Sequence, residues 1–145
     1  LSVLSIHCIP SAKITTNDQD QLDPNFAGYN GAVLIIRNYD NKTGYNAVDR
    51  TILKGFKKYY KGEFLMISEN DLSKYTDLDK YRFLIKSGLG SSRITGMSSG
   101  RPYAISSHIY MKDRKTNKEY TTKEYPDYSA LEKFPMVFEA LRASK

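Results

Sequence analysis

The segment from Ser87 to Arg101 combines residue types that are suited to binding an anion. It is rich in glycine and serine, so several backbone N–H groups can turn toward a ligand. Arg93 and Arg101 would supply the charge, and Ser91 and Ser92 would donate hydrogen bonds. The spacing matches neither a Walker loop nor a dinucleotide-binding fingerprint. We therefore expect a loop that is either a linker or a site for an anionic small molecule or sugar polymer.

A second candidate site is a group of lysines on a predicted helix. They share the polar side of residues 46–61, opposite the apolar stripe of that helix. Such a face can bind nucleic acid or another polyanion, or it can be a solvated surface whose cations complement the carboxyl end of the helix. Both interpretations stay open. The lysines are Lys54, Lys57, Lys58 and Lys61.

The sequence offers little for catalysis or metal binding. Its one cysteine, Cys8, excludes an intramolecular disulfide and a cysteine-rich metal site. No cluster of histidine and carboxylate residues has metal-ligand spacing, and no nucleophile-elbow motif is present. His108 falls inside a predicted strand, where a structural or solvent-facing role is expected. We predict no metal and no cofactor, and a non-enzymatic protein is favoured, although residues distant in sequence can still combine in the fold.

The most regular part of the chain is a predicted β-α-β unit. Residues 31–37 form a short apolar run with β-branched side chains, which is typical of a buried strand. Apolar residues then recur at helical spacing up to the glycine at position 62, and residues 63–68 are strand-like again. Asp49 lies in the first turn of this helix, where a carboxylate suits the positive end. In an alternative interpretation, residues 31–50 begin with a hairpin.

A third strand, a hairpin and a final helix are predicted to follow. The third strand covers residues 81–86, and the hairpin strands cover 103–112 and 119–125. Asp113 opens the hairpin turn and Asn117 can take the left-handed conformation that closes it. Apolar residues return at helical spacing from 128 to 143, and Pro135 inside that stretch predicts a kink or two short helices.

These elements predict an α/β fold. The order β-α-β-β, hairpin, α gives a two-layer sandwich, in which helices cover one face of a mixed sheet. A chain of 145 residues fits a single domain, here expected over residues 31–143. The predicted core contains Val33, Ile35, Val48, Ile52, Phe56, Leu65, Ile67, Phe83, Ile85, Ile109 and Phe138.

The residues before this domain indicate export. Residues 1–9 are apolar and then meet Pro10-Ser-Ala12, so residues 1–12 are typical of the end of a secretory signal peptide. Residues 13–30 are polar and are expected to form a flexible leader. The alternative for residues 1–12 is the first strand of a cytoplasmic domain. No apolar run is long enough to span a membrane.

The net charge of +6 and the isoelectric point near 9.3 favour acidic partners or simply serve solubility. With the segments Tyr59-Tyr-Lys-Gly-Glu-Phe64 and Asp79-Lys-Tyr-Arg-Phe83, the chain resembles small bacterial envelope proteins, and its element order is similar to the TolB amino-terminal domain. The resemblance implies a periplasmic or secreted, non-enzymatic binding or assembly module, whose partner would be an envelope protein or an anionic polymer. The alternatives are binding of nucleic acid or another polyanion through the lysine face, and an enzyme acting on an anionic small molecule or glycan.

Overall fold

The structure is a computed structural model that describes residues 14, 16–38, 47–93, 103–126 and 130–144. Its strands run in the order β2-β1-β3-β4-β5, and β6 pairs with β4 off this path. The strands are β1 (Val33–Ile36), β2 (Phe64–Ile67), β3 (Phe83–Arg93), β4 (Tyr103–Asp113), β5 (Glu119–Thr121) and β6 (Tyr125–Pro126). The helices are α1 (Ala47–Tyr59) and α2 (Ala130–Arg142), with shorter 3₁₀ segments η1 (Thr16–Gln21), η2 (Pro24–Phe26) and η3 (Glu69–Lys74).

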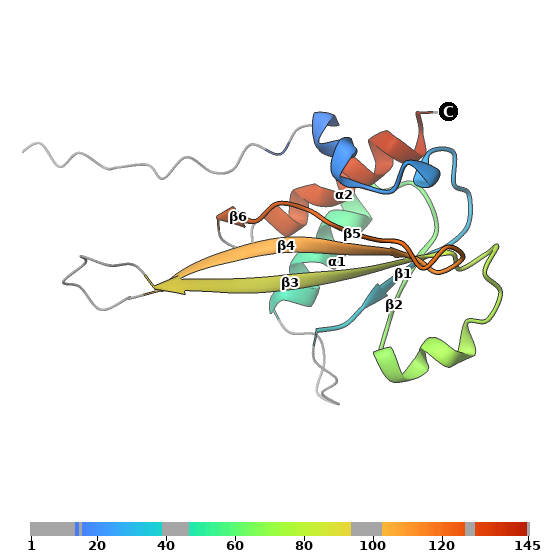
Figure 1. Ribbon diagram of the computed structural model, residues 1–145, viewed down its shortest axis with the longest axis horizontal. Helices are drawn as coiled ribbons and strands as arrows, with labels where there is room; N and C mark the ends of the chain where they lie inside the picture. The colour runs from blue at the N-terminus through green and yellow to red at the C-terminus, as the bar shows by residue number, and fades with distance from the viewer. Residues whose placement is uncertain (1–13, 15, 39–46, 94–102, 127–129, 145) are drawn as a thin grey trace, which may run out of the picture.

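The predicted fold class is confirmed. Strand β1 lies between β2 and β3 and is parallel to both, whereas β3, β4 and β5 are antiparallel. Helices α1 and α2 pack together on one face of this mixed sheet, and η3 lies on the opposite side (Figure 1). Because both edges of β1 are occupied, it has no free side for a hairpin partner. The alternative of a hairpin within residues 31–50 is therefore wrong.

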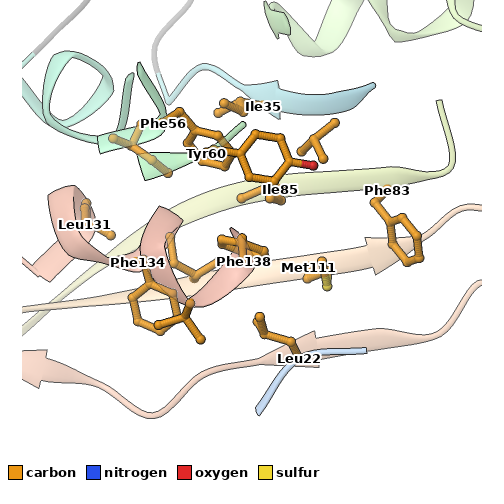
Figure 2. Close-up of a cluster of buried hydrophobic side chains, with 14 of the residues drawn as sticks. Leu22, Ile35, Phe56, Tyr60, Phe83, Ile85, Met111, Leu131, Phe134 and Phe138 are labelled. Atoms are coloured by element: carbon orange, nitrogen blue, oxygen red, sulfur yellow. The ribbon is translucent and has the colours of Figure 1, made fainter. Parts of the chain in front are cut away.

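Between the helices and the sheet lies the main core. Alternate residues of each strand point to this side, and side chains from both helices meet them there (Figure 2). Ten of the eleven predicted core residues are buried, and Leu65 is half-buried; Leu65 and Ile67 lie on the other face of the sheet. The ten are Val33, Ile35, Val48, Ile52, Phe56, Ile67, Phe83, Ile85, Ile109 and Phe138.

The segment expected to be a polar leader contributes to this core. Leu22 is 2% exposed and Phe26 is fully buried, with its ring 5.1 Å from that of Phe83 in a T-shaped contact. Gly28 has a φ of 72°, and its N–H donates to the carbonyl of Arg142 at the end of α2. Residues 16–30 thus pack on the domain instead of lying outside it, because a few apolar side chains bury a large area within an otherwise polar stretch.

Two further predictions differ from the structure. Residues 87–93 were expected in a loop, but they continue β3 and pair with β4 in unbroken register from Ser87↔Ile109 to Arg93↔Tyr103. Helix α2 is one continuous helix through Pro135, so of the two predicted alternatives, a kink or two short helices, the second is wrong. Pro135 is buried, and its packing offsets the backbone hydrogen bond that the ring removes, a loss of about 3 kcal/mol.

The predicted hairpin turn after β4 is confirmed. Asn117 has a φ of 59°, in the left-handed region. Asp113 accepts a hydrogen bond from the N–H of Lys115 at 2.9 Å, and its fully buried carboxylate forms a bidentate pair with Arg82, at 2.9 and 2.6 Å. Burial alone would raise the pKa of Asp113. The Arg82 guanidinium and the Lys115 N–H outweigh that effect and lower the pKa.

Glycine at position 55 allows the two helices to approach closely. Gly55 is buried in α1, and a Cβ built on it would lie 2.8 Å from the carbonyl carbon of Glu132 in α2 and closer still to the oxygen. No side chain fits there without separating the helices. Both helices must stay in contact, because their large aromatic residues share one core.

We expect Gly55→Ala to destabilise the protein, although alanine is the better helix former by about 1 kcal/mol. Overpacking against the α2 backbone should leave a net loss of about 1–3 kcal/mol in the free energy of unfolding. Urea denaturation measures it, with the exposed Lys57→Ala in the same helix as the matched control. Equal or greater stability of Gly55→Ala would contradict the proposed contact.

Replacing Asp113 should produce a pH-dependent loss of stability. Because the pKa is lowered in the fold, the ionised carboxylate stabilises the protein at neutral pH, and this contribution is lost as the pH falls through the folded pKa, below the usual value of about 4. Asp113→Asn should cost about 1.5–3 kcal/mol at pH 7, and the difference from wild type should shrink in acid. Asp79→Asn, which breaks an exposed pair with Lys115, is the control; a constant difference at all pH values would argue against the pair.

Candidate functional site

The face of the sheet that α1 and α2 leave uncovered carries a groove of about 670 Å³. This volume lies within the range of small-molecule binding sites. Strand alternation explains the lining: residues of β3 and β4 next to each core residue point to this side. The groove is lined by Ile36, Glu69, Leu72, Leu78, Leu84, Lys86, Ser87, Gly88, His108, Tyr110, Lys112, Arg114 and Asn117.

One part of the groove is apolar. Ile36 and Leu84 come from β1 and β3, and they belong to a small cluster of buried residues on this face. Leu72 of η3 packs against that cluster. Segment η3 is capped at its amino end by Ser68, whose hydroxyl accepts a hydrogen bond from the N–H of Asn70 at 3.3 Å. The cap thus holds η3 as one wall beside the strands.

Polar and basic side chains follow one another along β4. His108, Tyr110 and Lys112 occupy alternate positions of the strand, and Arg114 comes two residues later. Lys86 of β3 lies directly opposite Tyr110 in the ladder. Arg114 donates a hydrogen bond to the carbonyl of Tyr81 at 2.8 Å. The basic groups therefore lie in a row.

Carboxylates partly neutralise two of these cations. Glu69 lies 3.4 Å from the ammonium of Lys86, and Glu119 lies 3.7 Å from that of Lys112. A hydrogen bond with Glu119, together with burial, raises the pKa of Tyr110 to about 12, so its hydroxyl stays protonated at neutral pH.

Arg114 differs from the two lysines. Within the described part of the chain, no carboxylate forms an ion pair with it. Burial lowers the pKa of its guanidinium, but an arginine stays charged at neutral pH. A half-buried cation that is paired with a backbone carbonyl alone can accept an anionic group from a ligand.

Gly88 and His108 form one end of the groove. They are paired in the ladder, and a Cβ on Gly88 would overlap the imidazole ring, lying 2.9 Å from its Cδ2 and closer to Nε2. The Nδ1 atom of His108 is buried and has no hydrogen-bond partner within the described residues. The imidazole therefore occupies the space above the glycine where a side chain would lie, at the side of the groove.

A separate polar cluster lies where β1 ends. The backbone N–H and the side-chain amide of Asn38 donate to Asp49 at 3.1 and 2.9 Å, and the same amide donates to Ser87 at 2.6 Å. Asp49 lies in the first turn of α1, as predicted, and is fully buried. These bonds join β1 to α1 and β3, which is a structural role.

The lining of the groove combines cationic, polar and aliphatic side chains. Its lining includes neither a cysteine nor a nucleophile paired with a base. The described residues also contain no group of three histidine, cysteine or carboxylate side chains that could hold a metal ion. What the groove offers is positive charge next to an apolar surface.

The sequence-predicted sites lie elsewhere. Ser91, Ser92 and Arg93 belong to the far part of β3, and Arg101 lies outside the described residues, so a ligand site there stays a prediction. The four lysines Lys54, Lys57, Lys58 and Lys61 are exposed at α1 and just after it, on the helix side of the sheet. Lys54 lies 3.5 Å from Glu132 of α2.

Sequence reasoning missed the groove, although a signal was present. In the strand predicted over residues 103–112, His108, Tyr110 and Lys112 alternate with the apolar Ile109 and Met111. This alternation shows that the polar set shares one face. The position of Lys86 beside Tyr110 depends on the register between β3 and β4, which could not be predicted from the sequence.

Comparisons with known proteins found low-level structural similarity. No protein-family model matches the chain, and no curated protein matches its sequence. Two solved structures of PelC dodecamers from Paraburkholderia phytofirmans resemble it. A single-substitution variant is 8% identical, covering 80% of this chain and 91% of that chain with a TM-score of 0.45. The other is 9% identical, covering 82% of this chain and 91% of that chain with a TM-score of 0.44.

None of the described helices has the length and apolar character needed to span a bilayer.

The contact between Gly88 and His108 predicts coupled mutations. Gly88→Ala should push the imidazole out of its position and cost about 1 kcal/mol of stability. In a His108→Ala background the new methyl group has room, so the same substitution should cost much less. A double-mutant cycle by urea denaturation measures the coupling, and purely additive effects would show that the imidazole does not lie over the glycine.

Proposed function

We propose that the protein is a non-enzymatic binding module that holds an anionic ligand in the groove on the open face of its sheet. The single observation that supports this most is Arg114, a charged, half-buried group that lines the groove without a carboxylate partner in the described chain. Lys86 and Lys112 add positive charge beside it. Guanidinium and ammonium groups at a partly buried site bind anions more strongly than the same groups on an open surface.

Where the protein acts is part of the same proposal. The apolar residues 1–9, followed by a small-residue stretch, favour export to the bacterial envelope, as a periplasmic or secreted protein. Anionic polymers are common partners for a basic protein, and the net charge of +6 suits them. The partner class is therefore an anionic envelope component.

Two rival sites make the test specific. One is the lysine face at α1, which would bind a polyanion mainly by charge, with affinity that falls steeply with salt. The other is the pair Arg93 and Arg101, which would bind the anion at the end of β3. Each rival predicts that a different variant loses binding.

The experiment is calorimetric titration with polygalacturonate and with heparin at two salt concentrations. Arg114→Gln should weaken binding about tenfold or more, because a charged hydrogen bond contributes about 1.5–3 kcal/mol. Lys57→Gln, the matched control on the helix, should change affinity less than about twofold. Circular dichroism should confirm that all variants fold.

Three outcomes would contradict the proposal. Loss of binding in Lys57→Gln with no change in Arg114→Gln would place the site on the helix. Loss confined to the Arg93→Ala, Arg101→Ala double variant would place it at the far end of β3. Absence of binding to either polymer at low salt would remove the anion-binding function itself.

A further inference from the structure

The basic groups of the groove are distributed along a line. From Tyr110, which lies opposite Lys86, to Arg114 just past the end of β4, the chain advances by four positions, about 13 Å at strand spacing. Lys112 lies within this row, and Lys86 stands beside it on the neighbouring strand. A compact anion would contact only one or two of these groups at a time. The arrangement matches a ligand whose own charges repeat along its length.

The groove also contains a negative group. Glu69 lines it, with its carboxylate 3.4 Å from Lys86 and its side chain 72% exposed. A chain of phosphodiesters has only acceptors on its backbone, so this carboxylate would repel it. A sugar carries hydroxyl groups that donate to a carboxylate. The lining thus favours a ligand that has both anionic groups and donors.

The third observation is the apolar surface between the charges. Ile36, Leu72 and Leu84 are aliphatic, and the aromatic lining consists of Tyr110 and His108. Proteins that bind single-stranded nucleic acid stack successive bases on a series of aromatic side chains. Two rings and an aliphatic floor suit the carbon-bearing faces of sugar rings better than a run of bases.

We infer that the ligand is an extended acidic glycan of the uronate type, lying along β4 with its carboxylates on Lys86, Lys112 and Arg114 and its hydroxyl groups on Glu69. This inference rests on the proposed function, since it names the ligand class of the same groove. It adds two requirements on the ligand: a minimum chain length and hydroxyl groups that can donate hydrogen bonds.

The test is a length series of galacturonate oligomers, from the monomer to the hexamer, titrated calorimetrically into the full chain. Affinity should rise about tenfold or more with length and level off once the oligomer spans the row from Lys86 to Arg114, about 13 Å. Arg114→Gln should weaken every member of the series. Lys86→Gln, at a side chain that is 42% exposed, should weaken the hexamer by a larger factor than the monomer. Lys57→Gln is the matched control.

A second arm tests the role of Glu69. A single-stranded DNA hexamer is titrated beside the galacturonate hexamer, and wild type should prefer the glycan. Because Glu69 repels phosphates and accepts hydroxyl groups, Glu69→Gln should lower that preference several-fold. A neutral glucan hexamer should bind far more weakly than the uronate, since it lacks carboxylates.

The outcomes separate the two proposals. If monomer and hexamer bind equally well and Arg114→Gln weakens both, the extended ligand is wrong and the anion-binding groove stands. If DNA binds more tightly than the glycan, the ligand class is wrong. If no member of the series, no DNA and no heparin binds at low salt, the proposed function has failed together with this inference.

Discussion

The close approach of α1 and α2 at Gly55 determines which face of the sheet the helices cover and which face carries the groove. Because the helices touch backbone to backbone, they form one layer, and their aromatic residues all reach the same core. That layer covers one face of the sheet. On the other face, the short segment η3 covers only the region near β1 and β2, and the groove lies where that cover ends. The groove is thus a consequence of how the helices pack.

Sequence patterns predicted the elements whose side chains repeat with a regular period. Helix α1 and strands β1 and β2 follow from local periodicity, and the turn at Asp113 and Asn117 follows from residue chemistry alone. Ten of the eleven expected core residues are buried for the same reason. Leu65 and Ile67 both point to the face that η3 covers only partly; Ile67 is buried there and Leu65 is half-buried.

What the sequence did not predict depends on contacts between distant residues. Gly88 suggested a loop by composition, yet it lies in a strand because the ring of His108, twenty positions later, occupies the space of a side chain. Leu22 and Phe26 are single apolar residues in a polar stretch, and only the folded domain shows the surface that they cover. The groove combines η3, β3 and β4, so it exists only once their register is set.

The two longest strands have a consequence for how this domain can diversify. Strand β1 ends beside Lys86, whereas β3 and β4 continue to pair with each other as far as Arg93 and Tyr103, beyond the body of the sheet (Figure 1). Matched insertions or deletions in this ribbon would preserve the alternation of both strands and leave the register at the groove intact. The length of the ribbon can therefore change, in evolution or by protein engineering, without a change in the core.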